Sequence, residues 1–593
     1  MCEARDGKAW SFGGQSENRT EGIMEQNKKM NGLTIDKKEL TEKKNVSFKS
    51  KYTKKYFEIR REQLKSVFNY IKADLQELAD YFCPNSVRFI ARNANKNRQK
   101  SKKIIDSTPL IALRNFSSGM MSGATSPTSR WFKTGVLNKD IENSHAVKDW
   151  CFKQAELTRK ILNSSNFYQI LPEVYKQLGV FSFAAISLES DFENVVNFKN
   201  LPIGSYYFSR NSQGKIDTLC RNYTISAQNM VEEFGKENCS KKVLDALENT
   251  PNAMFEIVHF VEPNKDYIKD SPIKFQKKYI SVYYEVGSED KFLRKSGFER
   301  FPFIIFEAST NGEDDYPCMG PATYALPDVR QLMALTKEYA KAVKKIVSPT
   351  YKGPASLAKK NISDAPASFV EEDENGRGMS PVYEVNPRIL EVKQEKDDLK
   401  QIIKEHFYND LFAMILNTAQ RGRTATEVNE LKEEKMVLLS PLLEQIHCAL
   451  REVLDWIYFE QIDKKILPEI PEELNGQYIQ IEFISTLAQA QKVQSIASME
   501  RFTTFVANLS QAIDPILVQK IQGEKIIEDY AEFANIDPSQ VTPAEQIAKY
   551  REMMQQKQQQ QEQMAMMAQG SQLVKNMGGV DAFGGELAER LGA

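Results

Sequence analysis

The sequence has few of the residue types that build disulfide frameworks and metal centres. Its 593 residues include 7 cysteines and 4 histidines, and no two cysteines form a CxxC pair. An odd number of scattered cysteines favours buried thiols in a reducing cytoplasm over a disulfide framework or a zinc site. The histidines lack metal-ligand spacing, so we expect structural roles for them and no metal site. They are His145, His259, His406 and His447.

The chain also lacks a charge imbalance and long apolar runs. Its 79 basic and 80 acidic residues leave a formal net charge of −1. A dedicated nucleic-acid binder is usually basic, so any contact with DNA must work without a strong overall electrostatic attraction. No apolar run has the length of a membrane span, and no signal pattern opens the chain, so we expect no membrane partner.

Catalytic signatures are missing as well. The sequence has no GxxxxGK[ST] phosphate loop, no GxGxxG after a strand, no HExxH and no GxSxG. No pair of acidic residues has a spacing that suggests acid–base catalysis. These absences, together with the long helices described next, favour an assembly protein over an enzyme, with no cofactor.

The most informative stretch that is present runs from Ala419 to Gln461. Its apolar residues recur at spacings of three, four and seven, which predicts one apolar stripe along a helix roughly 50 Å long. The stripe consists of Val428, Leu431, Leu438, Leu442, Ile446, Leu450, Val453 and Ile457. Thr424 and Glu427 have the spacing of a capping box, so the helix should begin just after Thr424. Pro441 lies inside the pattern and predicts a kink.

A short polar segment precedes this helix and contains Gln420, Arg421, Gly422 and Arg423. Two interpretations are open from the residues alone. The segment is either an ordinary solvated loop with two surface arginines or a loop held against a polyanion.

The remaining pattern predicts an α+β, mainly helical fold. Residues 1–50 are polar and should be disordered, and Met24 or Met30 could be the true translation start. Helical patterns cover about 52–82 and 167–178, and Gly179 should end the second of these helices. Strand-like runs between 181 and 284 predict an antiparallel sheet, with a hairpin turn at 211–214 and a short helix at about 227–234. The basic stretch 88–103 is interpreted as a solvated loop, because no aromatic residues interleave it.

Two further helical patterns, 327–347 and 393–416, flank a proline-rich lobe. The lobe carries an acidic run, which is interpreted as a solvated loop rather than a metal site because nothing fixes its geometry. The run is Glu371, Glu372, Asp373 and Glu374. More helices are expected after residue 489, and they include a Gln- and Met-rich one at about 543–569.

Many short motifs, in a fixed order from about residue 52 to 565, resemble the head-to-tail connecting, or portal, proteins of short-tailed bacteriophages. Among the motifs that carry the resemblance are Leu78-Ala-Asp-Tyr-Phe-Cys-Pro84, Ser117-Ser-Gly-Met-Met-Ser-Gly123, Arg221-Asn-Tyr-Thr-Ile-Ser-Ala-Gln228, Gly297-Phe-Glu-Arg-Phe-Pro-Phe303, Gly320-Pro-Ala-Thr-Tyr-Ala-Leu-Pro-Asp328, Thr424-Ala-Thr-Glu-Val428 and Ile484-Ser-Thr-Leu-Ala-Gln-Ala-Gln-Lys492. No single motif identifies the family, but the order in which all of them occur along the chain is specific to it.

The resemblance implies a portal fold with wing, stem, clip and crown regions. The implied division is a disordered extension at 1–50, a wing at 51–320, stem helices at 321–347 and 392–416, a clip at 348–391, a tunnel loop at 417–424, a long kinked helix and return strand of the wing at 425–488, a crown at 489–569 and a flexible tail at 570–593. In this plan Arg421 and Arg423 would face the DNA in a central channel.

The resemblance also implies the function and the partners. Such proteins form a ring, usually of twelve identical subunits, at one capsid vertex of the virion, after assembly in the bacterial host cytoplasm. Double-stranded DNA is packaged through the ring by a terminase and later ejected by the same route. Major capsid, scaffolding and tail adaptor proteins would be the other partners. A non-ring scaffold built on long helices is the alternative, and an enzyme such as a nuclease or ATPase comes third.

Overall fold

The computed structural model describes most of the chain between residues 52 and 576. The described residues are 52–84, 87, 103–138, 141, 144–269, 271–288, 291–310, 316–317, 319–347, 351–352, 380–381, 389–416, 425–474, 479–484, 498–509, 523–533, 540–542 and 544–576. The predicted disordered extension 1–50 lies outside them.

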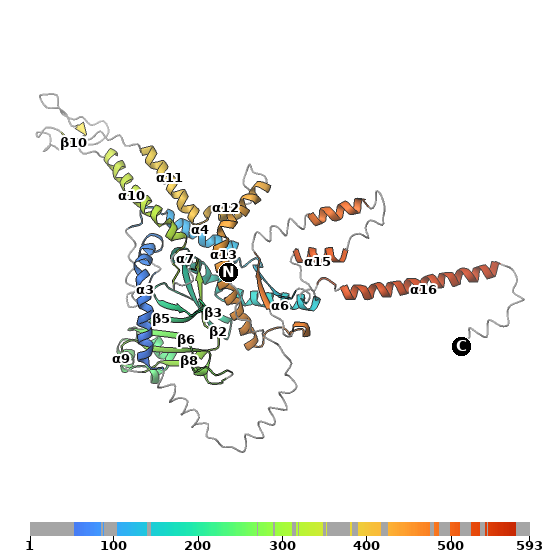
Figure 1. The fold of residues 1–593 in the computed structure, drawn as a ribbon, viewed down its shortest axis with the longest axis horizontal. Coiled ribbons are helices and arrows are strands. Elements are labelled where there is room, and N and C mark those ends of the chain that lie inside the picture. Colours follow the sequence, from blue (N-terminus) through green and yellow to red (C-terminus); the bar gives the residue numbers. More distant parts are fainter. Residues whose placement is uncertain are drawn as a thin grey trace, which may run out of the picture. The chain divides into compact units, whose positions relative to one another are not determined.

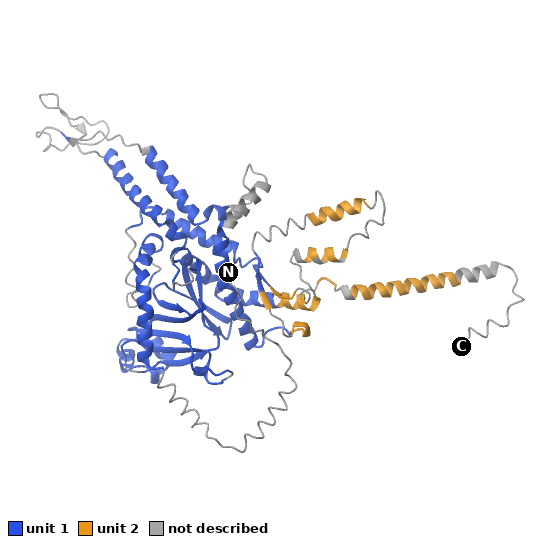
Figure 2. Cartoon of the chain, viewed as in Figure 1, with its two compact units in different colours: residues 1–133, 154–469, 481–486 blue, residues 134–153, 470–480, 487–593 orange. Residues whose placement is uncertain are grey.

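The chain divides into two compact units, coloured separately in Figure 2. Unit 1 comprises Met1–Lys133, Gln154–Glu469 and Ile481–Thr486. Unit 2 comprises Thr134–Lys153, Ile470–Gln480 and Leu487–Ala593. The fold is α+β and mainly helical, as the sequence predicts.

The first helices of the part of the chain that the structure describes are α3 (Lys54–Phe82), α4 (Thr108–Gly123), α6 (His145–Ser164) and α7 (Phe167–Phe181). Thr53 caps α3, since its hydroxyl accepts a hydrogen bond from the backbone N–H of Tyr56. Phe57, Leu64 and Phe68 repeat at helical spacing and are buried in the core. The predicted first helix is therefore confirmed.

Gly179 lies inside α7 and does not end it, contrary to the prediction from the sequence. This glycine is buried. The helix ends instead at Phe181, followed by Ser182 with a left-handed φ of 67°. A Cβ on Gly179 would lie 2.9 Å from the Phe116 ring of α4. The glycine therefore permits close packing of two helices and is not a C-terminal cap.

The predicted strands, together with β3 and β8, which the sequence analysis did not predict, form two antiparallel sheets. Their strand orders are β3-β2-β9 and β4-β5-β6-β7-β8. The strands are β2 (Phe183–Asp191), β3 (Val195–Leu201), β4 (Tyr206–Arg210), β5 (Ile216–Ser226), β6 (Met254–Pro263), β7 (Tyr279–Glu285), β8 (Arg294–Phe298) and β9 (Phe303–Glu307). β8 escapes sequence analysis because it contains no Val, Ile or Thr and lies at the sheet edge. The predicted hairpin turn joins β4 to β5, and Gly214 has the expected positive φ, 78°.

Short helices and a small sheet complete this region. They are α8 (Ala227–Phe234), η2 (Lys236–Asn238), α9 (Lys241–Asn249), η3 (Lys274–Gln276) and the two-stranded pair of β1 (Phe132–Val136) with β12 (Ile479–Phe483). α8 lies where the sequence predicts a short helix, whereas α9 is not predicted.

Helices α10 (Pro321–Val347) and α11 (Ile389–His406) run side by side (Figure 1). Most of the predicted clip between them lies outside the described residues, except that β10 (Tyr351–Lys352) pairs with β11 (Ser380–Pro381). The single helix predicted for 393–416 is divided. α11 ends at His406, and the short α12 (Asn409–Leu416) follows.

Helix α13 (Ala425–Asp463) has 39 residues and begins directly after Thr424, as predicted. The residues of the predicted stripe from Leu442 onward, ending at Ile457, are buried in the core. Leu438 was expected in this stripe but is 67% exposed. Pro441 lies inside the helix, which continues on both sides of it. A kink there stays a prediction.

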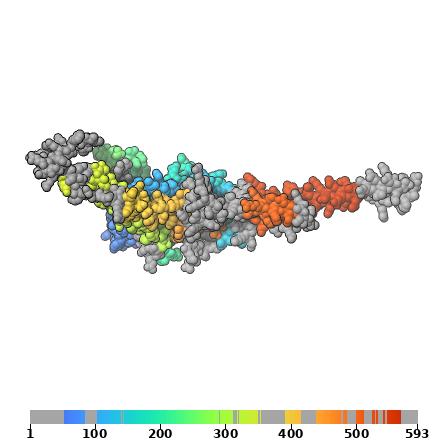
Figure 3. Space-filling model, turned by 90° about the horizontal axis from the view of Figure 1, so that it is seen from above, coloured from blue at the N-terminus to red at the C-terminus, as the bar shows by residue number. Residues whose placement is uncertain are grey.

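Unit 2 contains η4 (Glu472–Leu474), a helix at 498–509, α15 (Gly523–Phe533) and α16 (Ala544–Asn576). α16 continues beyond Gln569, into the range predicted as a flexible tail. Its side chains from Arg551 to Met567 are all exposed, and the helix is coloured red in Figure 3.

Three of the described cysteines, Cys151, Cys220 and Cys239, are buried, as the sequence predicts. Cys220 and Cys239 are buried thiols, and burial raises the pKa of each.

Candidate functional site

The candidate site is the end of the α10–α11 hairpin that leads through α12 to residues 417–424. The predicted tunnel-loop residues Gln420, Arg421, Gly422 and Arg423 lie outside the described residues, and so does Thr424. The backbone of Glu427 lies in the first turn of α13, where a capping box would place it. The acidic run 371–374 is also outside the described residues.

The two helices of the hairpin are joined by polar contacts as well as apolar packing. The Lys396 ammonium lies 4.7 Å from the centre of the Tyr339 ring, which is a cation–π distance. Gln331 donates a hydrogen bond to the Glu395 carboxylate at 3.2 Å. The hairpin therefore has its own lateral contacts away from the core.

Ion pairs tie the base of the hairpin to the rest of unit 1. Arg330 of α10 lies 2.5 Å from the Glu77 carboxylate of α3. Lys400 of α11 lies 3.8 Å from Asp106, just before α4. Burial alone would raise the pKa of Asp106, but hydrogen bonds from Thr108 and the charge of Lys400 hold it below its ordinary value. The Asp106 carboxylate therefore stays negatively charged and pairs with Lys400 of α11.

Acidic and basic side chains are interleaved along the hairpin. Lys341 lies 2.6 Å from Glu338, and Lys400 lies 3.3 Å from Asp397. Both pairs lie between neighbouring turns of one helix, where exposed ion pairs contribute little stability.

At the far end of α11 the chain turns sharply before α12. Tyr408 has a left-handed φ of 56°, and its N–H donates to the Glu405 carbonyl oxygen at 2.9 Å. α12 then packs on α4 through Phe412, whose ring lies 6.1 Å from the Phe116 ring between centroids. Sequence analysis missed this turn, because Tyr408 is not a residue type typical of left-handed backbone.

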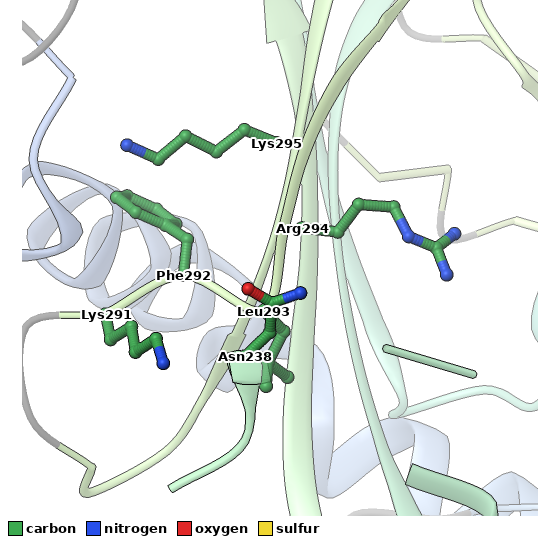
Figure 4. A pocket seen from close by; sticks show the side chains of 6 residues that line it. All are labelled: Asn238, Lys291, Phe292, Leu293, Arg294 and Lys295. Atoms are coloured by element: carbon green, nitrogen blue, oxygen red, sulfur yellow. The ribbon is translucent and has the colours of Figure 1, made fainter. Parts of the chain in front are cut away.

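A cavity of about 500 Å³ lies elsewhere in unit 1, between η2 and β8 (Figure 4). It is lined by Asn238, Lys291, Phe292, Leu293, Arg294 and Lys295. Its cations are engaged within the chain: Lys291 donates to the Glu237 carbonyl oxygen, and Arg294 donates to that of Glu233 at 3.0 Å. These contacts brace the sheet edge, and we do not assign a ligand to the cavity.

The described part of the chain holds no group of three or more His, Cys, Asp or Glu residues placed to bind a metal ion. Within the same residues, no helix combines the length and apolarity that a membrane crossing requires.

A family model described as "Bacteriophage head to tail connecting protein" matches residues 54–541. The chain belongs to this family. The match covers nearly all of the range over which the motifs suggested it. Its function is accordingly that of a portal, or head-to-tail connector, protein of short-tailed phages.

Two curated relatives agree with the family assignment. The chain is 33% identical over 520 residues to "Portal protein" of Salmonella phage epsilon15, which covers 87% of this chain and 93% of the relative. It is 33% identical over 513 residues to "Probable portal protein" of Bordetella phage BPP-1, covering 85% and 92% respectively. Both alignments therefore span almost the whole of the relatives.

Among solved structures, a chain of "Neck of empty GTA particle computed with C6 symmetry" matches with a TM-score of 0.36 and 10% sequence identity. This match covers 67% of this chain and 86% of that chain. A likeness of this size carries no argument about function.

Proposed function

We propose that this protein forms a closed ring, with twelve copies as the expected number, at one vertex of a phage capsid and conducts double-stranded DNA through a central channel. The observation that carries the proposal is the family match over residues 54–541, together with two portal-protein relatives aligned over more than nine-tenths of their lengths. The ring is a conduit without chemistry of its own, and a terminase supplies the energy for packaging.

The parts of the chain are assigned as follows. α10 and α11 are the stem helices, residues 348–391 are the clip, residues 417–424 are the tunnel loop, and the helices after residue 489 are the crown. The hairpin supports this assignment, because two adjacent helices leave the core and are joined by 348–391. The clip would contact the terminase first and the tail adaptor later.

The formal net charge of −1 supports a conduit through which DNA slides, because many strong phosphate contacts would hold the DNA in place. Acidic and basic residues alternate on α10 and α11, for example in the pairs Glu338–Lys341 and Asp397–Lys400, so the surface of the hairpin is not uniformly basic. In a ring, Arg421 and Arg423 of each copy would face the DNA and supply a small number of repeated contacts. Major capsid and scaffolding proteins would contact the wing in the assembled virion, after assembly in the host cytoplasm.

Electron microscopy of the purified full-length protein tests the proposal, first alone and then with capsid and scaffolding proteins. Rings with a central hole support it, and their symmetry gives the subunit number. An extended or irregular particle in both preparations would instead favour a non-ring scaffold built on the long helices. ATP hydrolysis or DNA cleavage that is lost on a point substitution would favour an enzyme.

A further inference from the structure

One glycine of α4 allows an unusually close approach between α4 and α12. A Cβ placed on Gly119 would lie 2.1 Å from Cγ of Phe412 and within 2.5 Å of both Cδ atoms. No real Cβ fits at such distances, and the obstacle is the middle of a ring rather than the flexible end of a side chain. Gly123, one turn later in the same helix, has nothing within 4 Å of its Cβ position. The requirement for glycine is therefore local to Gly119.

The Phe412 ring belongs to a buried aromatic cluster that surrounds the turn between α11 and α12. Phe116 lies 6.1 Å from both Phe412 and Phe407, and Phe82 lies 5.6 Å from Phe407, between ring centroids. All four side chains are buried. We call Gly119 and these four phenylalanines the Gly119 seat. It fixes both ends of the turn to α4 and α3.

Helix α12 depends on the seat for its position. It has only 8 residues, too few for a helix to be stable alone. The left-handed backbone of Tyr408 is costly for a non-glycine residue and persists only where surrounding contacts hold it. When its amide is oriented to satisfy both groups, Asn409 donates to the carbonyl oxygens of Ala112 and Phe407 at 3.0 and 3.3 Å. The contacts to α4 thus set where α12 lies.

We propose that Gly119 and Phe412 are positioning residues for DNA passage: the Gly119 seat fixes α12 on α4, and with it the direction in which the chain leaves Leu416. This inference rests on the proposed portal function. It also gives a role to the motif Ser117-Ser-Gly-Met-Met-Ser-Gly123. Ser117 Oγ donates a hydrogen bond to the Pro172 carbonyl oxygen of α7 at 2.6 Å. The Phe412 ring of α12 packs against Gly119 of the same motif. Helix α4 thus contacts both α7 and α12 through this motif.

The test uses full-length protein assembled into particles with its capsid protein, scaffolding protein and terminase. Gly119→Ala is compared with Gly123→Ala, a matched control that adds the same methyl group to the same helix. Ring formation and the fraction of DNA-filled heads are both measured. We expect Gly119→Ala to form rings but to give at least tenfold fewer DNA-filled heads, and Gly123→Ala to match the unsubstituted protein on both counts.

Two further variants separate a change in the position of α12 from a loss of folding. Phe412→Leu loosens the seat without a clash and should also form rings that package or retain DNA poorly. Combining Gly119→Ala with Phe412→Leu makes room for the added methyl group and should recover part of the loss seen with Gly119→Ala alone.

The proposal is overturned if Gly119→Ala rings fill and retain DNA normally. If Gly119→Ala does not fold, Phe412→Leu decides. Normal DNA filling, or failure of ring assembly, in Phe412→Leu would show a contact that is merely structural. Failure of the proposed function would look different, because the unsubstituted protein itself would then give no rings or no DNA-filled heads.

Discussion

Replacing Arg210 with methionine should destabilise unit 1 strongly, and more at pH 8 than at pH 5. Arg210 at the end of β4 forms an ion pair with Glu307 at the end of β9. The pair joins the five-stranded sheet to the three-stranded sheet, and each side chain is only 12% exposed. Arg210 also donates to the Gly214 carbonyl oxygen at 3.1 Å. The contact is therefore internal and screened from solvent.

The magnitude follows from the buried charge that the substitution leaves behind. Removing one partner of a buried ion pair typically costs about 3–5 kcal/mol of unfolding free energy. Burial raises the pKa of Glu307 above its ordinary value, and the charge of Arg210 opposes that rise. Without Arg210 the pKa rises further.

The pH dependence follows from that raised pKa. An acid whose folded pKa exceeds its unfolded pKa binds protons more tightly when folded. It therefore gains stability as the pH falls between the two pKa values, by about 1.4 kcal/mol per pH unit. The cost of Arg210→Met should accordingly shrink by at least about 1.4 kcal/mol between pH 8 and pH 5, as Glu307 takes up a proton.

Urea unfolding followed by near-ultraviolet circular dichroism at both pH values measures this effect. Lys199→Met is the matched control. Its ion pair with Glu189 is 46% exposed on both sides, so a loss of at most about 1 kcal/mol is expected, nearly independent of pH. Arg210→Met with Glu307→Met should recover most of the stability, since it leaves no buried charge. An equal cost at the two pH values, or a double variant as unstable as the single one, would refute the reasoning.

Two other predictions concern pH and DNA. His259 is buried against the Ser281 hydroxyl at 3.0 Å, and burial lowers its pKa well below the ordinary value, so the protein should lose stability as the pH falls below about 6.5, where only the unfolded chain takes up the proton. His259→Gln should reduce that slope in urea unfolding between pH 7 and pH 5, and an unchanged slope would contradict the assignment. Arg421→Ala with Arg423→Ala should leave ring assembly intact while altering packaging or DNA retention. Normal packaging and retention in that double variant would show that these arginines do not act on DNA.

Strong periodicity made the long helices predictable from the sequence. The start of α13 at Ala425 agrees with the capping box at Thr424, and the buried residues of α3 follow their expected spacing. Leu438 departs from its pattern, because it is exposed while the next residue, Leu439, is buried. A sequence pattern predicts a helix face, but the extent of the core along that face depends on tertiary contacts.

The features that the sequence did not reveal depend on residues far apart in the chain. Glycine is a typical residue at the end of a helix, but Gly179 lies inside α7, where the absence of a side chain lets the Phe116 ring of α4 pack closely. The break at Tyr408 interrupts a continuous helical pattern and is maintained by contacts with α4. Gly119 and Phe412 meet only in the folded chain. The candidate DNA contacts Arg421 and Arg423 were identified through family resemblance, since their local sequence is equally typical of a solvated loop.

The most direct test of the account is single-particle electron microscopy of the full-length protein, alone and together with its capsid and scaffolding proteins. The account predicts closed rings of identical subunits around an open channel wide enough for duplex DNA in at least one of these preparations. Extended or irregular particles, or closed particles without a channel, in both preparations would contradict it.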